Sequence, residues 1–329
     1  MEKVLSISVA CYNLGEMILD NLKSFCESDV ANDIELIVTD DGSKDNSVEI
    51  VEEYAKKFPN IIKLVKKSNE GPGSTVNSGI KNATGKYFRM VDGDDWVDSQ
   101  NLVEFVELLK KSSADIIVSD FCIYDNKKGE VISVEKSNLE PNKEMEIDDT
   151  YLNLPIQMHA MTFKTEIFQK NNILLDNCFY TDVEYLLYPI PFCKTIVYFN
   201  KPIYMYRVAQ AGQSVNPNSM KKNIKQHELV FQNLLNMHNN KKNNLRIGQK
   251  NYICNRLAIM ADVQLGTYLL FDASKENKIR IKQFITNLKE NYRDIYNQFK
   301  KSKKAMALIY SNYLLYPLLA KKYKKLMAN

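Results

Sequence analysis

Long apolar runs are missing from this 329-residue chain, although 45% of its residues are hydrophobic. No stretch reaches the roughly 18 consecutive apolar residues that a membrane-spanning helix needs. The first residues, MEKVLSISVACYN, are too polar for the core of a signal peptide and are better interpreted as a β-strand. The composition therefore predicts a globular protein, long enough for two domains or for one domain with a large appendage.

Cysteine is scarce and widely spaced, with six residues and no Cys-x-x-Cys pair. This spacing disfavours a disulfide framework and a structural zinc site, and it predicts the reduced thiols of a cytoplasmic protein. An excess of one charge is also missing, because 44 basic residues face 40 acidic ones. We expect no nucleic-acid partner, and only local clusters of charge carry information.

The common phosphate-binding loops are absent as well. No Gly-x-x-x-x-Gly-Lys-Ser/Thr motif occurs, and no Gly-x-Gly-x-x-Gly follows the first apolar run. These absences exclude Walker-type nucleotide binding and Rossmann-type dinucleotide binding. A nucleotidyltransferase usually opens with a glycine-rich, arginine-bearing loop near its first strand, and SVACYNLGEM at 8–17 lacks one.

The first 120 or so residues alternate β-rich runs with segments of helical periodicity, as in βαβ units on a parallel sheet. The predicted strands are 4–10, 34–39, 61–65, 86–91 and 115–121. Apolar residues spaced by three and four predict helices within 16–27, 45–58, 74–83 and 99–111. We therefore expect an α/β fold with a doubly wound, mostly parallel sheet.

Polar motifs follow three of the predicted strands: CYN at 11–13, TDDGS at 39–43 and DGDD at 92–95. In an open α/β sheet, ligands bind at the carboxyl ends of the strands. The DGDD motif places Asp92, Asp94 and Asp95 within four positions. Carboxylates so close together repel one another unless a cation or several donors offset their charge. An EF-hand that starts at Asp92 is rejected, because Val97 and Val103 stand where glycine and glutamate are required. A divalent ion that bridges the carboxylates and a ligand diphosphate is the best account.

Four stretches together resemble a family 2 glycosyltransferase of the GT-A fold: SISVACYN, IELIVTDDGSKDNS, NSGIKNATGKY and MVDGDDWVD. The resemblance implies a nucleotide-sugar donor, Mn²⁺ or Mg²⁺, and inversion at the anomeric carbon in one displacement. It also implies that 92–94 is the DxD motif, with Asp94 as metal ligand and Asp92 near the donor ribose or the metal. Tyr12, Asn13 and Asp41 match positions that hold the base and the ribose.

An inverting transferase also needs a general base that takes a proton from the acceptor hydroxyl. The segment NCFYTDVEYLLYPIPF at 177–192 resembles the family's acidic pair ahead of an aromatic-rich helix. Asp182 matches the base, and Glu184 is the second candidate, expected on the acceptor side. The structural alternative for Asp182 is an acid that interacts with the helix macrodipole.

Residues 122–218 are expected to complete the acceptor side, with a hairpin at 122–134 and with His159 as a substrate contact or a buried structural residue. Val76 stands where many relatives carry an arginine, so a contact with the donor phosphate must lie elsewhere. PIYMYRVAQAGQSV at 202–215 resembles the family segment that closes over the donor. Its Arg207 or Gln213 is therefore expected at the diphosphate, with a surface charge as the alternative.

Glycine and proline are almost absent after residue 219, and helical periodicity continues to the end. We expect a GT-A domain at 1–218, divided into a nucleotide-sugar half at 1–121 and an acceptor half at 122–218, and a helical region at 219–329. The last segment, 300–329, carries four lysines on either side of an apolar, tyrosine-rich stretch. This pattern predicts peripheral attachment to the anionic inner face of a cell membrane. The alternative is a helix packed on the protein itself or on a second subunit.

The resemblance thus implies a metal-dependent enzyme that moves a hexose or N-acetylhexosamine from a nucleotide sugar, by default a UDP-sugar, to a saccharide acceptor. A lipid-linked acceptor of bacterial surface polysaccharide synthesis, such as a capsule, is expected, and a homo-oligomer is compatible with the sequence. The alternative is a catalytically decayed module that binds a nucleotide sugar or a glycan.

Overall fold

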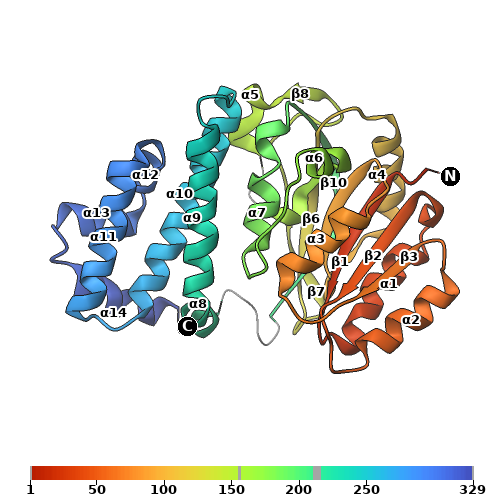
Figure 1. Ribbon diagram of the computed structural model, residues 1–329, viewed down its shortest axis with the longest axis horizontal. Helices are drawn as coiled ribbons and strands as arrows, with labels where there is room; N and C mark the ends of the chain where they lie inside the picture. The colour runs from red at the N-terminus through yellow and green to blue at the C-terminus, as the bar shows by residue number, and fades with distance from the viewer. Residues whose placement is uncertain (1, 155–156, 210–215, 328–329) are drawn as a thin grey trace. The chain divides into compact units, whose positions relative to one another are not determined.

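The computed structural model describes residues 2–154, 157–209 and 216–327, and it has the predicted α/β architecture (Figure 1). Its strands are β1 (Leu5–Cys11), β2 (Ile34–Asp40), β3 (Ile62–Lys66), β4 (Tyr87–Asp92), β5 (Trp96–Val97), β6 (Ile116–Asp125), β7 (Glu130–Glu135), β8 (Glu144–Glu146), β9 (Met161–Lys164) and β10 (Thr195–Val208). The first four predicted strands agree with β1 to β4 to within about one residue at each end. β6 is longer than predicted, because its last residues pair with both β7 and β10.

These strands form one sheet with the order β3-β2-β1-β4-β9-β6-β10-β5, to which β7 adds beside β6 and β8 beside β10. β3, β2, β1 and β4 run parallel to one another, and so do β6 and β10. β9 lies antiparallel between β4 and β6. β4 and β6 therefore point the same way, and the carboxyl ends of the parallel strands share one edge of the sheet.

Four helices connect the first strands, where the apolar periodicity predicts them: α1 (Ile18–Cys26), α2 (Ser47–Lys57), α3 (Pro72–Asn82) and α4 (Ser99–Lys111). α4 shows the local reason for its start, because the carboxylate of Asp98 accepts hydrogen bonds from the N–H groups of Gln100 and Asn101. Its buried stripe then repeats at spacings of three and four: Leu102, Phe105, Val106 and Leu109.

Residues 116–208 complete the sheet and add the short helices α5 (Ile147–Thr150), α6 (Thr165–Lys170) and α7 (Thr181–Leu187). The predicted hairpin is formed by β6 and β7, with Gly129 at a φ of +71° in its turn. A buried aromatic cluster joins α6 and α7 to the sheet, since the rings of Phe168 and Tyr185 stack at 5.7 Å and both lie against Phe163. This packing fixes α7, the helix that carries Asp182.

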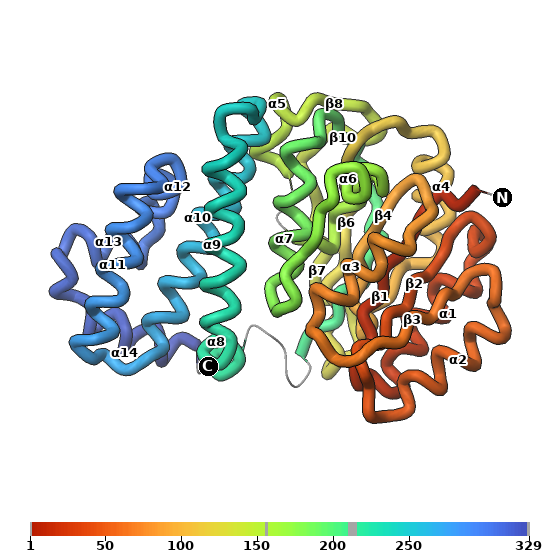
Figure 2. Tube along the Cα trace, in the orientation of Figure 1, coloured from red at the N-terminus to blue at the C-terminus, as the bar shows by residue number. Residues whose placement is uncertain are grey.

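The chain divides into two compact units, 1–210 and 211–329. The described helices of the second unit are α8 (Pro217–Lys222), α9 (Ile224–Lys241), α10 (Ile247–Leu270), α11 (Lys275–Asn291), α12 (Arg293–Phe299), α13 (Lys303–Tyr310) and α14 (Tyr316–Leu326). Within this unit, α10 packs against α8, α9 and each helix from α11 to α14 (Figure 2). α10 is therefore the central helix of the second unit.

The basic tail forms α13 and α14, joined by a turn in which Asn312 and Tyr313 have positive φ. One side of the tail is packed: the side chains that are at most 2% exposed are Ala305, Leu308, Tyr316 and Ala320. The Tyr316 hydroxyl donates to the carbonyl oxygen of Asp272 at 3.1 Å. The alternative of packing on the protein thus holds for one side of the tail, while the other side exposes Tyr310, Leu314 and Leu318. In the part of the chain that is described, no helix combines the length and the apolar character needed to cross a membrane.

Candidate active site

The carboxyl edge of the parallel strands gathers the polar motifs that the sequence predicts. Cys11 pairs with Asp40 and Ala10 pairs with Asp92, so β1, β2 and β4 end side by side. The loops that follow these strands are the CYN, TDDGS and DGDD motifs. They form one candidate site at the edge where an open α/β sheet binds ligands.

The turn from Asp92 to Asp95 is fixed by backbone contacts. The Asp95 N–H donates to the carbonyl oxygen of Asp92 at 3.1 Å, and the Asn21 amide donates to the carbonyl oxygens of Asp95 at 2.9 Å and Asp92 at 3.3 Å. A Cβ atom on Gly93 would lie 2.4 Å from the carbonyl oxygen of Ala10, so only glycine fits there. The turn therefore presents its carboxylates at defined positions.

Asp95 is the buried member of the acidic turn. One carboxylate oxygen accepts from the Tyr204 hydroxyl at 2.6 Å, and the other accepts from the Arg207 N–H at 2.7 Å. Burial, together with Asp92 and Asp94, holds the pKa of Asp95 well above its usual range. Asp95 therefore ties β10 to the turn.

Asp92 and Asp94 are less buried than Asp95. Burial, then Asp94 and then Asp182 raise the pKa of Asp92 to about 8, and burial raises the pKa of Asp94. One ligand atom each from Asp92, Asp95 and His159 lie within 4.8 Å of one another. A cation offsets such crowded carboxylates, so the residues present fit a divalent metal ion.

His159 lies beside this acidic turn in an aromatic setting. Its ring stacks on Tyr206 at 4.2 Å and meets Tyr204 edge-on at 4.6 Å. Burial and the nearby charge of Arg89 lower the pKa of His159 to about 3, so the imidazole is neutral at physiological pH. Its Nδ1 atom has no hydrogen-bond partner within the described residues. Both predicted roles, a substrate contact and a structural residue, are compatible with this position.

Asp182 stands in the first turn of α7, as the sequence predicts. Its charge contributes to the raised pKa values of Asp92 and Tyr206, so the fold brings it near the acidic turn although it is distant in sequence. Tyr180, which precedes the helix, has a φ of +75°. That conformation is costly for a large side chain and persists where surrounding packing enforces it, often at functional sites.

Glu184 is placed differently from its prediction. Its side chain has no exposed surface, and its Oε2 atom accepts from the N–H of Asp176 at 2.9 Å. Burial, followed by the charge of Asp176, raises the pKa of Glu184 to about 8. Glu184 therefore supports the loop before α7.

Arg207 also differs from its prediction as a contact to the donor diphosphate. Its Nε donates to the carbonyl oxygen of Asp94 at 2.8 Å, and its Nη2 donates to the carboxylate of Asp20 at 2.6 Å. The guanidinium lies 4.5 Å from the ring centre of Trp96. Arg207 is thus engaged in holding the acidic turn. Gln213, the other predicted contact, lies outside the described residues.

The residues that are predicted to hold the nucleotide base and the ribose of the donor fall into two classes. Tyr12 is 49% exposed at the end of β1 and is open to a ligand. Asn13 and Asp41 mainly hold neighbouring loops: Asn13 accepts from the N–H of Lys44 at 2.7 Å, and Asp41 accepts from the N–H groups of Glu70 and Gly71 at 2.9 Å. Asp41 is 3% exposed, so it joins the loop after β2 to the start of α3.

A comparison with protein families decides the assignment. The family model described as "Glycosyl transferase family 2" matches residues 6–171, about half of the chain. The chain belongs to glycosyl transferase family 2. The residues matched include the three motif loops, of which the DxD turn is the third.

Two relatives of this family 2 chain carry curated names. A cholesterol galactosyltransferase of Borreliella burgdorferi is 30% identical over 55% of this chain and 54% of its own length. A poly(ribitol-phosphate) beta-glucosyltransferase of Bacillus spizizenii is 34% identical over 34% of this chain and 18% of its own length. The chain therefore spans about half, or less, of the length of these relatives.

Among solved structures, S. aureus TarS 1–349 in complex with UDP-GlcNAc superposes with a TM-score of 0.61 at 20% identity. The superposition covers 98% of this chain and 88% of that one. This similarity shows the fold, and it confirms the predicted GT-A class with a mostly helical C-terminal part.

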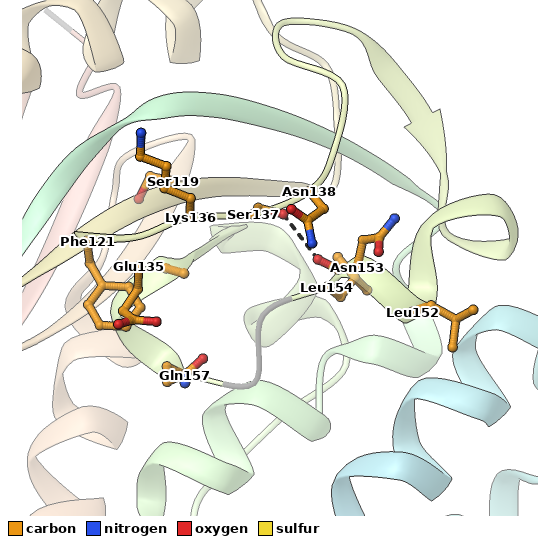
Figure 3. Close-up of a pocket in the computed structure, with 11 residues that line it drawn as sticks. Ser119, Phe121, Glu135, Lys136, Ser137, Asn138, Leu152, Asn153, Leu154 and Gln157 are labelled. Carbon is orange, nitrogen blue, oxygen red and sulfur yellow. Dashed lines mark hydrogen bonds between the residues drawn. The ribbon is translucent and has the colours of Figure 1, made fainter. Parts of the chain in front are cut away.

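The family 2 domain also contains a cavity of about 210 Å³ next to the His159 segment (Figure 3). Phe121 forms part of its wall, and the centre of the Phe121 ring lies 5.2 Å from the centre of the His159 imidazole. Leu152, Leu154 and Ala160 add apolar surface, and the other lining residues are polar or charged, with Ser137 donating to the carbonyl oxygen of Asn153 at 3.1 Å. Such a mixture of a ring and polar groups suits a ligand rich in hydroxyl groups.

Three residues that hold the site were missed in the sequence. Asn21 and Tyr204 belong to no motif, and Asp95 was considered only as part of the acidic cluster. Asn21 did carry a signal, because it lies on the apolar face of α1 between Ile18 and Phe25 and is fully buried. A polar residue on a buried helix face needs a hydrogen-bond partner, which here is the acidic turn.

Proposed function

We propose that this chain is an inverting glycosyltransferase that moves a hexosyl or N-acetylhexosaminyl group from a UDP-sugar to a hydroxyl group of a saccharide acceptor. The observation that carries the proposal is that α7, whose first turn holds Asp182, is bound to β4, the strand that ends in the DxD turn, since the Tyr185 hydroxyl donates to the carbonyl oxygen of Phe88 at 3.3 Å. Family membership and the names of the relatives support glycosyl transfer. The UDP-GlcNAc complex of TarS, which has the same fold, supports a UDP-sugar donor.

Asp94 and Asp92 would hold Mn²⁺ or Mg²⁺. When bound, such an ion supplies positive charge that stabilises the departing nucleoside diphosphate. The chain's own contribution is to position the ligands, because Asn21 and Arg207 hold the backbone of the turn and Asp95 ties it to β10. Ligands fixed before the donor arrives need no reorganisation during transfer.

Asp182 serves as the general base. The acceptor oxygen forms a bond to the anomeric carbon while the bond from that carbon to the diphosphate oxygen breaks. The diphosphate leaves with the electron pair, and the Asp182 carboxylate takes the proton of the acceptor hydroxyl. Asp182 stands in the first turn of α7, on the helix that the buried aromatic cluster holds against the sheet.

The donor and acceptor occupy different parts of the carboxyl edge in this proposal. Tyr12 contacts the donor base directly, while Asn13 and Asp41 shape the loops around the base and ribose. His159 borders the acceptor through the adjoining 210 Å³ cavity, whose polar lining suits a sugar ring. Residues 1–218 would carry all of these contacts.

Two substitutions test the mechanism. Asp182→Asn should keep UDP-sugar affinity, measured by calorimetry, and lose a factor of about 10²–10⁴ in transfer, measured as acceptor-dependent UDP release. Asp94→Asn should instead lose metal-dependent donor binding together with turnover. Transfer near the wild-type rate by Asp182→Asn would refute the base assignment.

A binding module without catalysis is the second candidate, and one observation favours it. Val76 is 1% exposed within α3, so no charge reaches the donor phosphates from the position where many relatives have arginine. Incubation with Mn²⁺ and a panel of nucleotide sugars separates the two functions. If none of these donors is turned over, with or without saccharide acceptors, the enzyme proposal fails.

We further propose that the acceptor is lipid-linked, as in surface polysaccharide synthesis, and that the described tail, 300–327, attaches the protein to the inner face of the cell membrane. The supporting observation is the exposed side of α13 and α14, where Tyr310 is 85%, Leu314 77% and Leu318 66% exposed between two groups of lysines. Apolar side chains flanked by lysine suit the headgroup region of an anionic bilayer. Attachment would bring the site to an acceptor held in the same membrane.

A further inference from the structure

Three helices of the second unit bring together a histidine, a cysteine and an aspartate. His238 lies near the end of α9, Cys254 on α10 and Asp294 on α12. One ligand atom from each lies within 4.8 Å of the other two. Among the described residues, this is the one such group that contains a cysteine. None of the three has a part in the proposed transfer.

The imidazole of His238 is buried with few partners. It is 3% exposed, and its contact within the described residues is from Nε2 to the Sγ atom of Cys254 at 3.8 Å. Its Nδ1 atom has no hydrogen-bond partner there. A buried ring with one long contact is under-satisfied, and such groups usually have a specific reason.

The other two groups complete a set of metal ligands. Cys254 is 4% exposed, so its sulfur is shielded from oxidants and solvent. Asp294 is half exposed, and its Oδ2 atom accepts from Lys250 at 2.8 Å. A carboxylate has a second oxygen, so the ion pair with Lys250 does not use the group completely.

We propose that His238, Cys254 and Asp294 bind Zn²⁺, with water in the fourth position. Thiolate and imidazole together favour zinc over the magnesium or manganese that carboxylates alone prefer. A tetrahedral zinc ion with ordinary bond lengths places its nitrogen and sulfur ligands about 3.6 Å apart, close to the separation present here. On binding, the thiol proton of Cys254 leaves to solvent and a zinc–sulfur bond forms.

The ion acts as a clasp that joins α9, α10 and α12. Because the ligands come together only in the folded unit, zinc binds the native state and raises the melting temperature of the chain. The zinc site has no part in glycosyl transfer, so the zinc proposal can be tested separately from the proposed enzyme activity.

Cobalt(II) tests the site with the full-length, metal-free protein, because a cobalt–thiolate bond absorbs in the near ultraviolet. The DxD turn offers only oxygen and nitrogen ligands and gives no such band. Wild type should develop the thiolate band with one equivalent of cobalt and lose it when zinc chloride is added. Asp294→Asn, a change at a half-exposed position, should weaken zinc binding at least about 10-fold.

Lys250→Ala is the matched control, since it removes the ion pair with Asp294 but keeps all three ligands. Its zinc affinity should equal or exceed that of wild type. Cys254→Ser should show no thiolate band while binding of Mn²⁺ by the DxD turn is retained. Absence of the band in wild type, its persistence in Cys254→Ser, or equal losses in Asp294→Asn and Lys250→Ala would each overturn the proposal.

Discussion

The guanidinium of Arg207 binds the backbone of the acidic turn and stacks on Trp96. The sequence resemblance instead predicts this cation at the donor diphosphate. It is 8% exposed, and its partners come from three separate segments: Asp20, Asp94 and Asn126. A planar group with several donors is suited to this task, whereas lysine offers one point charge. Arg207 therefore positions Asp94, one of the two proposed metal ligands.

Arg207→Lys should loosen the turn without removing the positive charge. We expect about 10-fold weaker donor binding in the presence of Mn²⁺ and a loss of about 1–3 kcal/mol in the free energy of unfolding, because several buried hydrogen bonds and the stacking are lost. Calorimetry and denaturant titration measure the two effects. Asp20→Asn removes only the partly exposed ion pair and should cost less than about 1 kcal/mol. Equal effects of both changes would contradict the positioning role.

Glu184 makes the stability of the protein depend on pH. In the unfolded chain its pKa is about 4.3, and in the native state burial and Asp176 raise the pKa to about 8. Between these values the native state keeps a proton that the unfolded state releases, so the free energy of unfolding falls as the pH rises. Glu184→Gln is neutral throughout, and its melting temperature relative to wild type should increase from about pH 5 to about pH 8. A difference that stays constant over this range would show that Glu184 does not titrate in this window.

At the scale of elements, the contact between α3 and β1 sets how closely the third βα unit, β3 and α3, lies on the sheet. Gly79 faces Ser8, and a Cβ atom at this glycine would lie 2.1 Å from the serine Oγ and 2.5 Å from its Cβ. Glycine is unfavourable within a helix by roughly 1 kcal/mol relative to alanine, so close packing has outweighed helix propensity here. The same helix begins at the loop held by Asp41.

Gly79→Ala should therefore destabilise the fold even though alanine favours helices. We expect a loss of about 1–3 kcal/mol in the free energy of unfolding, from overpacking against β1. Ser78→Ala, one residue away on a less buried side of α3, is the matched control and should change stability by less than about 0.5 kcal/mol. A Gly79→Ala variant as stable as wild type would mean that α3 shifts on the sheet at little cost.

At the scale of the whole molecule, the tail has one side that is packed on the second unit and one side that is exposed. Ala305, Leu308 and Tyr316 are covered by the second unit, so removing the tail would uncover apolar surface on α10. Leu314 and Leu318 lie on the uncovered side. Substitutions on that side test membrane attachment without disturbing the packed side.

The double variant Leu314→Ser/Leu318→Ser should keep its melting temperature and lose most sedimentation with vesicles that contain anionic phospholipid. Binding of the wild type should decrease with salt, because the lysines contribute about 1 kcal/mol each near a charged surface. Ile247→Ser/Ile279→Ser changes two other exposed apolar residues of the same unit and should bind vesicles like wild type. Equal binding by both double variants, or wild-type binding to neutral vesicles alone, would rule out the tail.

The sequence by itself determined the strands β1 to β4, the helices α1 to α4 that follow them, the DxD motif and the place of Asp182 at a helix start. These features depend on residues near one another in the chain: apolar periodicity, turn residues and caps act over one or two helical turns. Where the chain carried a local conflict, as at Asn21 on an apolar face, the sequence also held a signal that a partner was needed.

Only the tertiary structure decided the partners of Arg207, Glu184 and Asp95, and the meeting of His238 with Cys254 and Asp294. Each of these contacts joins segments that are distant in sequence, and no spacing rule relates their positions. The role of a charged side chain depends on its burial and on its nearest hydrogen-bond donors. An unpaired buried charge costs several kcal/mol, which is comparable to the free energy of unfolding of a whole domain. That choice is made by packing among all the elements, so it becomes visible only when they are assembled.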